Sequence, residues 1–404
     1  MIDRSARTLL TAMASSSIGA VLYTYAGYPA LLWMINHLRP GRVAGPTSAV
    51  GGMSASNGDQ SAPWLSVIVA AHNEQAVIRR RLDNLERSTT PRDQFEIIVV
   101  DDGSTDRTAE FAERPGVRVL RMTERGGKSA ALNRAVEEAR GRLLVFSDAN
   151  NDFAPDTVDE LIRPFEDPRV GVVTGRRIIV DDLERTNARA ESLYWRYESA
   201  VNRWETSLGS VTAVTGEVLA VRREAYVPLA AGTINDDLTL GLEAACNGWR
   251  LAYAPDARSY EPAAASLQGE ETRRARIVAG RYRVLARLLP RLLVRRPLLA
   301  WQLISHKGLR PVVPVAMAIA AVANLPLLGD GRRWRVVGAA QLAFYGLAVA
   351  GAVDARAGRR HGPTYLPYYL CRMNLAALRG LGDLLRRRDV TRWQRVRRAD
   401  ESDG

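Results

Sequence analysis

The hydrophobic positions of this chain fall into two regions with different spacing. Long apolar stretches without a charge lie near both ends, at Ile18–Leu38, Pro311–Leu328 and Val336–Val353. Since a helix rises about 1.5 Å per residue, these stretches approach or exceed the length that crosses a hydrocarbon core of about 30 Å. The first predicts an N-terminal transmembrane anchor within residues 1–40, and the other two predict a transmembrane hairpin. A cleaved signal peptide and a hairpin buried in the core are the alternatives.

The middle of the chain alternates short β-branched runs with amphipathic segments. The runs that predict strands are Leu65–Ala70, Glu96–Val100, Val117–Met122, Leu143–Ser147, Val170–Thr174, Val218–Val221 and Leu251–Tyr253. Helical spacing of apolar residues follows the first run at 77–85 and the third at 131–139. This alternation predicts an α/β domain over residues 64–290, with a largely parallel sheet and helices on both faces. In such domains ligands bind at the carboxyl ends of the strands.

The remaining segments place this domain at a membrane. Residues 41–63 are small, polar and aperiodic, which predicts a flexible linker. Residues 291–388 hold the hairpin and two mixed apolar and basic segments, Pro297–Leu309 and Tyr365–Leu385, which predict interfacial helices. Residues 389–404 form a basic tail. By the positive-inside rule the tail and the domain are cytoplasmic and the N-terminus lies outside.

Composition narrows the class of protein further. With 56 Lys and Arg against 44 Asp and Glu, the 404-residue chain has a formal net charge of +12. Because basic residues border the apolar stretches, the charge favours anionic lipid headgroups over nucleic acid as its partner. The two cysteines, Cys246 and Cys371, exclude a disulfide framework, and no Cys/His cluster in the sequence offers a zinc site.

Polar residues gather directly after three of the predicted strands. The first run ends in Ala71-His72-Asn73-Glu74, the second in Asp101-Asp102-Gly103-Ser104 and the fourth in Asp148-Ala149-Asn150. Each cluster alone is also typical of an ordinary turn or helix cap. Three of them at strand ends instead indicate one ligand site at the edge of the sheet.

These clusters, together with the segment from Gly126-Gly127-Lys128 to Asn133, closely resemble family 2 glycosyltransferases of the GT-A fold. The resemblance covers about residues 64–290. The flanking helices are similar to the membrane-bound branch that includes cellulose, hyaluronan and poly-N-acetylglucosamine synthases. The resemblance implies a Rossmann-like domain that binds a nucleotide diphosphate sugar. The residues it assigns to the donor are Ala71, Asn73, Glu74, Asp101, Asp102, Lys128, Asp148, Arg273 and Arg276.

Within this set, Asp101 and Asp102 resemble the acids that face the uridine in the family, and a plain surface lysine is the alternative for Lys128. The family's metal motif has the form Asp-x-Asp, and here it reads Asp148-Ala149-Asn150. The resemblance therefore implies Mg²⁺ or Mn²⁺ held by Asp148 and Asn150. Both offer oxygen ligands suited to a hard divalent cation, although the amide adds no charge.

The resemblance assigns the catalytic base to the start of a late amphipathic helix, which begins at Asn235-Asp236-Asp237-Leu238. Asp237 lies 11 residues before Gly248, which is the family's spacing, so Asp237 matches the base and Asp236 its acidic neighbour. A carboxylate there can take the proton of an attacking hydroxyl in a single inverting displacement. The alternative is that these acids only stabilise the helix dipole.

One family motif is altered. Many processive members carry Gln-x-x-Arg-Trp on the helix that enters the membrane, and here Arg273 replaces Gln and Ile277 replaces Trp. Arg276 keeps the cation, and a guanidinium suits phosphate oxygens. For Arg274, contact with lipid headgroups is the alternative. Losing the aromatic platform argues against processive polymer synthesis.

The expected function is therefore inverting transfer of a sugar from a UDP-sugar to a glycan acceptor by a multi-pass protein of the inner (plasma) membrane, with a cytoplasmic catalytic domain. A polyprenyl phosphate or glycolipid acceptor is the alternative within enzymes. A nonenzymatic, nucleotide-sensing membrane partner is the alternative from a different class.

Overall fold

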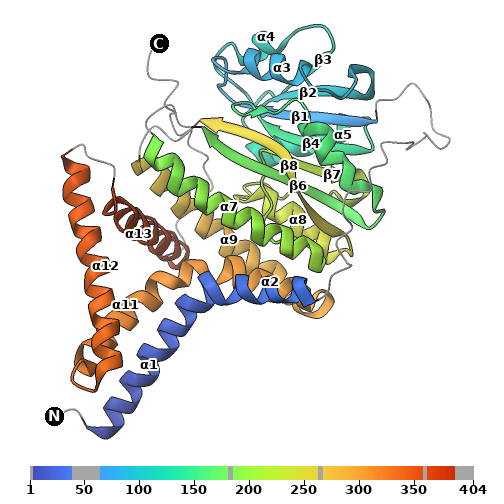
Figure 1. The fold of residues 1–404 in the computed structure, drawn as a ribbon. Coiled ribbons are helices and arrows are strands. Elements are labelled where there is room, and N and C mark those ends of the chain that lie inside the picture. Colours follow the sequence, from blue (N-terminus) through green and yellow to red (C-terminus); the bar gives the residue numbers. More distant parts are fainter. Residues whose placement is uncertain (1–2, 39–63, 181–184, 263–266, 358–361, 387–404) are drawn as a thin grey trace.

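The computed structural model describes residues 3–38, 64–180, 185–262, 267–357 and 362–386. It consists of an α/β domain that rests on a wedge of long helices (Figure 1). The predicted linker at 41–63 and the basic tail at 389–404 lie outside the described residues.

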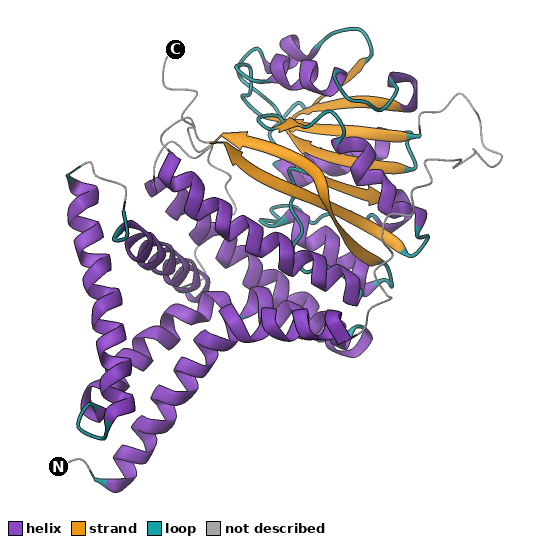
Figure 2. Ribbon diagram, viewed as in Figure 1, coloured by secondary structure: helices purple, strands orange, loops and turns teal. Residues whose placement is uncertain are grey.

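One eight-stranded sheet runs through the α/β domain (Figure 2). Its strands are β1 Leu65–Ala71, β2 Phe95–Asp101, β3 Val117–Arg121, β4 Leu143–Asp148, β5 Asp152–Phe153, β6 Val170–Val180, β7 Leu219–Arg222 and β8 Arg250–Pro262. The spatial order is β3-β2-β1-β4-β7-β6-β8-β5. The half made of β3, β2, β1 and β4 is parallel, whereas β7 is antiparallel to both β4 and β6, and β5 is antiparallel to β8. All seven predicted strands are present, and the two-residue β5 was too short to leave a pattern in the sequence.

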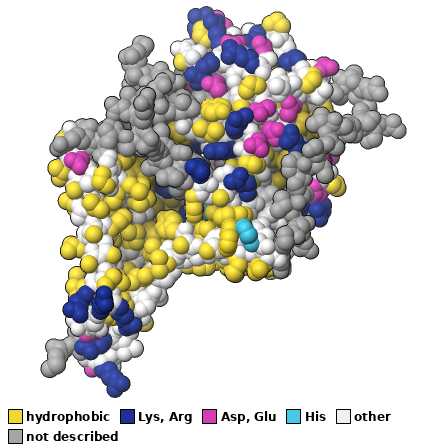
Figure 3. Space-filling view, in the orientation of Figure 1, with side chains coloured by type: hydrophobic (Ala, Val, Ile, Leu, Met, Phe, Trp, Pro, Cys, Tyr) yellow, Lys and Arg dark blue, Asp and Glu magenta, His cyan; other side chains and the backbone are white. Residues whose placement is uncertain are grey.

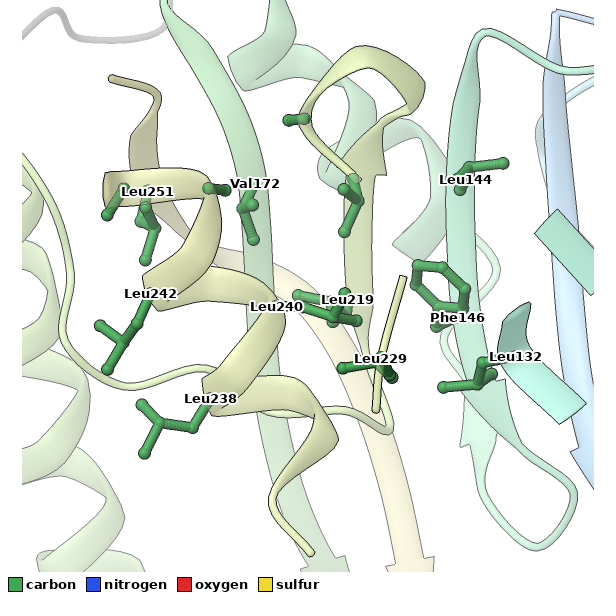
Figure 4. Close-up of a cluster of buried hydrophobic side chains, with 14 of the residues drawn as sticks. Leu132, Leu144, Phe146, Val172, Leu219, Leu229, Leu238, Leu240, Leu242 and Leu251 are labelled. Carbon is green, nitrogen blue, oxygen red and sulfur yellow. The ribbon is translucent and has the colours of Figure 1, made fainter. Parts of the chain in front are cut away.

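Helices cover both faces of the sheet because its strands bury side chains on both sides. One face packs against α3 (Ile78–Glu86), α4 (Thr108–Ala112) and α6 (Thr157–Ile162). The other packs against α5 (Lys128–Glu138) and α8 (Asp236–Cys246). Figure 4 shows Leu240 of α8 next to Leu219 of β7, while Leu238 and Leu242 project from the other side of the helix. This core holds the first turn of α8 in a defined place against the sheet.

The remaining helices lie below or beside the sheet in Figure 1. They are α1 (Arg4–Leu22), α2 (Tyr28–Leu38), α7 (Arg185–Leu208), α9 (Leu267–Arg295), α10 (Pro297–Leu303), α11 (Val313–Asn324), α12 (Arg332–Arg356) and α13 (Tyr365–Leu385). Short 3₁₀ segments lie at Arg92–Gln94, Arg163–Glu166, Arg223–Ala225, Arg310–Val312 and Leu325–Leu327, and π-helical turns at Tyr23–Gly27 and Ile304–Gly308.

Three helical segments are long and apolar enough to cross a membrane: Arg4–Leu38, Pro297–Leu327 and Arg332–Arg356. Figure 3 shows apolar side chains along this helical wedge. Two details differ from the sequence-based interpretation. The segment Pro297–Leu309, expected as a separate interfacial helix, is continuous with the second candidate span. The second half of the N-terminal segment, α2, packs against α7 of the α/β domain, with Tyr28, Leu32 and Val201 in one buried cluster.

Candidate active site

Three strand ends bring the predicted polar clusters to one edge of the sheet. In the register of the parallel strands, Ala71 of β1 pairs with Asp101 of β2, and Ala70 pairs with Asp148 of β4. The segments that follow β1, β2 and β4 therefore lie side by side, as expected for the carboxyl ends of parallel strands.

The loop after β1 is held in an unusual backbone conformation. Asn73 has a φ of 57°, in the left-handed region that few residues other than glycine adopt. Its side-chain oxygen accepts a hydrogen bond from Thr105 N–H at 2.8 Å, and its own N–H donates to Ser104 Oγ at 2.9 Å. Buried Glu74 follows, and its N–H donates to Thr108 Oγ1 at 2.8 Å. These bonds lock the β1 loop to the β2 loop, and such local strain is typical of binding sites.

The two acids after β2 have different partners. Asp102 Oδ1 accepts the Gly126 N–H at 2.7 Å, and its Oδ2 accepts the Gly127 N–H at 2.9 Å. Gly127 has a φ of 82°, which glycine adopts without steric cost, and directly precedes α5. Asp101 Oδ1 is buried and accepts no hydrogen bond from the part of the chain that the structure describes. Asp102 thus shapes the Gly-Gly turn, and Asp101 is the acid of this pair with an acceptor left for a ligand.

Lys128 begins α5 and reaches the third cluster. Its Nζ lies 2.7 Å from Asp148 Oδ1 and 3.4 Å from Asp236 Oδ2, so one ammonium joins the end of β4 to the start of α8. Burial opposes the charge of Lys128, but the carboxylates of Asp148 and Asp236 outweigh burial and raise its pKa. This geometry favours the site position over the surface-lysine alternative.

Asp237 lies in the first turn of α8 beside this ion pair. Its Oδ2 accepts the Gly216 N–H at 3.2 Å, and its Oδ1 accepts the Leu238 N–H at 2.6 Å. Burial and the neighbouring Asp236 carboxylate raise the pKa of Asp237 to about 7, against the opposing effect of Lys128. A carboxylate that titrates near neutral pH is suited to accept a proton during turnover. A helix dipole alone would lower the pKa instead.

A second group of charges lies on the side of α9. Arg273 Nη2 is 3.4 Å from Glu217 Oε1, and Arg177 Nη1 is 3.7 Å from the same oxygen. Glu217 Oε2 is buried without a hydrogen-bond partner among the described residues, and burial raises the pKa of Glu217 against the effect of Arg177. Arg276 is partly buried, and burial and Arg273 lower its pKa. The predicted residues Arg273 and Arg276 lie in this group together with Glu217 and Arg177, which the sequence analysis did not name. For Glu217, a Gly-Glu pair just before β7 was the available signal.

Comparison with known proteins names the domain. Residues 66–227 match the sequence model of Glycosyl transferase family 2. These residues are a family 2 glycosyltransferase domain. The matched segment contains the three strand-end clusters, Lys128 and Glu217, and it ends before α8 and Asp237.

The relatives of the glycosyltransferase domain include lipid and polysaccharide synthases. A beta-monoglucosyldiacylglycerol synthase of Nostoc sp. is 32% identical over 201 residues, which are 47% of this chain and 43% of that protein. A poly-beta-1,6-N-acetyl-D-glucosamine synthase of Staphylococcus aureus is 26% identical over 231 residues, which are 55% of this chain and 56% of that protein. The chain therefore spans about half the length of these curated relatives.

A solved structure resembles the chain over nearly its whole length. A mannosyltransferase of Pyrobaculum calidifontis, solved in complex with GDP-Man and Mn²⁺, superposes with a TM-score of 0.66 at 22% identity. The superposition covers 95% of this chain and 100% of that one. At this identity the likeness concerns the fold, and it confirms the GT-A fold predicted from the sequence.

The donor atoms at the end of β4 fit a hard divalent cation. Asp148 offers carboxylate oxygens and Asn150 an amide oxygen, which are the ligand types that Mg²⁺ and Mn²⁺ accept. Among the described residues no group of three or more His, Cys, Asp and Glu could hold a metal ion by itself. Asp148 and Asn150 would hold such a cation, and it would supply positive charge for a diphosphate.

Proposed function

We propose that the chain is a membrane-bound inverting glycosyltransferase that transfers a sugar from a UDP-sugar to an acceptor held at the membrane. The observation that carries the proposal is the position of Asp237. Its carboxyl has a raised pKa and lies in the same cluster as the Lys128–Asp148 ion pair. The proposed base for the acceptor hydroxyl thus lies next to Lys128 and Asp148, the residues proposed to bind the diphosphate and its cation.

In this mechanism Asp237 takes the proton of the acceptor hydroxyl while that oxygen forms a bond to the anomeric carbon of the sugar. The bond from that carbon to the diphosphate oxygen breaks on the opposite face, and its electron pair leaves with the nucleoside diphosphate. One displacement inverts the anomeric carbon, so an α-linked donor gives a β-linked product. Asp236 supports the base in two ways, since it pairs with Lys128 and raises the pKa of Asp237.

The donor is held from two sides. Asp101 Oδ1 is the acceptor left for the uracil N–H or a ribose hydroxyl, and Lys128, Arg273 and Arg276 supply positive charge for the diphosphate. A Mg²⁺ or Mn²⁺ ion held by Asp148 and Asn150 would offset the charge of the leaving diphosphate. The fold relative solved with GDP-Man and Mn²⁺ is in line with a nucleotide sugar and a divalent cation.

A lipid-linked acceptor fits the surroundings of the site better than a free glycan. The segment that carries Arg273 and Arg276 packs closely against α13. At Gly380 of α13 there is no room for a side chain, because a Cβ there would clash with the carbonyl oxygen of Ala275. α13 exposes Leu366, Leu370 and Leu375. Exposed leucines of this kind on a helix next to candidate membrane spans suit contact with acyl or prenyl chains. Ile277 in place of the family's Trp removes a platform for a sugar chain, and the Nostoc relative is named for a glucosyldiacylglycerol product.

The proposed location is the plasma membrane of the cell, with multiple spans and the glycosyltransferase domain in the cytoplasm. Three candidate spans support it. The tip of the helical wedge argues against this orientation, because it carries several arginines and the positive-inside rule favours the cytoplasm for them. An Arg7–Asp330 ion pair connects the two segments of the tip. The arginines are Arg4, Arg7, Arg332, Arg333 and Arg335. That tip would lie on the outer side.

The test is a turnover assay of the full chain in lipid nanodiscs. Release of UDP or GDP is measured with a panel of UDP- and GDP-sugars, in the presence of diacylglycerol, a polyprenyl phosphate or a β-glucan oligosaccharide, and products are identified by mass spectrometry. We expect release from a UDP-sugar that depends on one of the two lipids. Oligosaccharide-dependent release would overturn the lipid acceptor. Tight UDP binding without release from any donor would overturn the enzyme in favour of a nucleotide sensor.

A further inference from the structure

A second cluster of charged groups lies outside the catalytic site, where α7 meets the membrane-side helices. Glu205 and Glu198 of α7 are almost fully buried, as is His306. Arg310 pairs with Glu198 Oε1 at 2.5 Å and Lys307 with Glu198 Oε2 at 3.1 Å. Two carboxylates thus face a histidine and two cations in a region that excludes water.

Two π-helical turns lie beside this cluster, one in each of two candidate membrane spans. The turns are Tyr23–Gly27 between α1 and α2, and Ile304–Gly308 between α10 and the segment leading to α11. They face one another, since Tyr23 Oη lies 2.8 Å from Ser305 Oγ. In Figure 1 the bend between α1 and α2 turns α2 along the underside of the domain. Isolated π turns inside long helices are frequently found at functional positions.

Glu205 connects the membrane side to the glycosyltransferase domain. Its Oε1 accepts the Tyr28 hydroxyl at 2.5 Å and lies 2.8 Å from His306 Nδ1, and both of these residues belong to candidate spans. Its Oε2 accepts the Thr212 N–H at 2.8 Å and the Thr212 hydroxyl at 2.9 Å. The carboxylate therefore has partners on both oxygens, two from the membrane helices and two from the domain.

Thr212 begins a short segment that ends at Gly216, and Gly216 contacts the proposed base Asp237. Between them the chain is fixed once more, where Thr215 N–H donates to Thr174 Oγ1 at 3.0 Å. Gly216 N–H then donates to Asp237 Oδ2 at 3.2 Å. The contact there is close, because a Cβ on Gly216 would lie 3.3 Å from Asp237 Cβ. A segment of five residues, Thr212–Gly216, thus connects the Glu205 carboxylate to the N–H that bonds Asp237.

We propose that Tyr28, a residue of the N-terminal membrane helix, is a positioning residue for the catalytic base, acting through Glu205 and the segment Thr212–Gly216. The inference rests on the proposed function, in which Asp237 is the base. It assigns the membrane helices a part in turnover beyond attachment, because they supply the hydroxyl and the imidazole that hold Glu205 in place. Small displacements of a reacting group have large effects on rate, so a distant contact can matter in this way.

The test uses Tyr28→Phe with Tyr23→Phe as its matched control. Each variant removes one phenolic hydroxyl from the same helix bend, and only that of Tyr28 bonds Glu205. Thr212→Val removes a hydroxyl bond to Glu205 from the domain side. In nanodiscs, with all proteins checked for folding by thermal unfolding, we expect Tyr28→Phe and Thr212→Val to lower kcat about tenfold. KM for the donor sugar should change by less than about twofold, because no donor residue lies on this path. Tyr23→Phe should keep kcat.

A second readout separates positioning from simple loss of stability. The Gly216 N–H stabilises the charged form of Asp237, so a misplaced Gly216 raises the pKa of the base. The acid limb of kcat should then move to higher pH in Tyr28→Phe and Thr212→Val, and stay in place in Tyr23→Phe.

Several results would overturn the inference. One is a kcat and a pH profile of folded Tyr28→Phe that match those of Tyr23→Phe. Another is an equal loss of kcat in all three variants, which would assign the effect to general loosening of the bend. A fully active Asp237→Asn protein would instead remove the proposed function on which the inference depends, so the two failures are distinguishable.

Discussion

Two carboxylates in this molecule have pKa values shifted in opposite directions. Asp237, the proposed base, has a raised pKa, whereas the effects of His306, Tyr28 and Thr212 on Glu205 outweigh burial and lower the pKa of Glu205. Burial acts to raise the pKa of both carboxylates, so burial alone cannot explain the difference. Glu205 receives partners on both oxygens from Tyr28, His306 and Thr212, while Asp237 receives two backbone N–H groups and has a like charge, Asp236, beside it.

The comparison shows how one chain keeps a carboxylate charged in one place and ready for a proton in another. Hydrogen-bond donors on both oxygens of Glu205, and the cations Lys307 and Arg310 beside Glu198, favour the ionised form of these two carboxylates. A close like charge leaves Asp237 poised near neutral pH, which makes it reactive. The predictions below test this division, from the largest expected effect to the smallest.

The largest effect is expected on turnover from Asp237→Asn. The amide keeps the shape of the side chain but cannot accept the acceptor's proton, so UDP release should fall by about 10²–10⁴-fold. Donor binding by calorimetry should survive, because Asp237 faces the acceptor. If Asp237 only serves the helix N-terminus, the change is mild, since Asn is also a good cap.

Glu205→Gln is the matched substitution at the other carboxylate. The amide replaces one carboxylate oxygen with an NH₂ group, which cannot accept the hydrogen bonds that Tyr28 and Thr212 donate to the two oxygens of Glu205. A buried donor left without its partner costs about 1–3 kcal/mol of the free energy of unfolding. We therefore expect a marked drop in thermal stability from Glu205→Gln and little from Asp237→Asn. Equal stability of the two variants would contradict the division of roles.

Chelation is expected to have the next largest effect. Loss of a cation that offsets the diphosphate charge removes several kcal/mol of transition-state stabilisation, about 10² in rate or more. EDTA should abolish UDP release, and Mg²⁺ or Mn²⁺ should restore it. Asp148→Ala should be inactive with or without metal, whereas the unfolding temperature of the ligand-free protein should barely respond to EDTA. Undiminished turnover of Asp148→Ala in chelator would exclude the proposed metal site.

The smallest and most specific effect concerns pH. Because the pKa of Asp237 is raised to about 7, kcat should fall about tenfold per pH unit below that value and level off above it. The pKa values of Glu198 and Glu205 are lowered, so the stability they contribute is present above their unfolded pKa of about 4.3 and is lost as pH falls through the lower folded values. Between pH 7 and 5 the enzyme should therefore lose activity reversibly while remaining folded, which circular dichroism and back-titration can check.

Much of the fold and part of the site follow from local sequence. The spacing of apolar residues predicted seven of the eight strands and the covering helices. This works because the apolar residues of a strand or helix lie on the side that is buried. Chain order then places the clusters after β1, β2 and β4 at one sheet edge, because parallel strands end together. The position of Asp237 in the first turn of a helix could be read in the same way.

Other features depend on contacts that no local pattern records. The local sequence does not distinguish the roles of Asp101 and Asp102. Only the folded loop shows that the Asp102 carboxylate accepts hydrogen bonds from the N–H groups of Gly126 and Gly127. Glu217 lies near Asp148 and Arg273 because β7, which follows it, runs antiparallel beside β4.

The cluster around Glu205 is the clearest case. Tyr28 and Glu205 are 177 residues apart, and His306 is another 101 residues along the chain. By itself the sequence determined that Pro297–Leu309 is apolar with a few charges, for which lipid headgroups are the expected partners. Only the tertiary structure shows that His306 and Lys307 face α7 instead. The free energy of burying a polar or charged side chain depends on its partner, and here that partner comes from a distant segment of the chain.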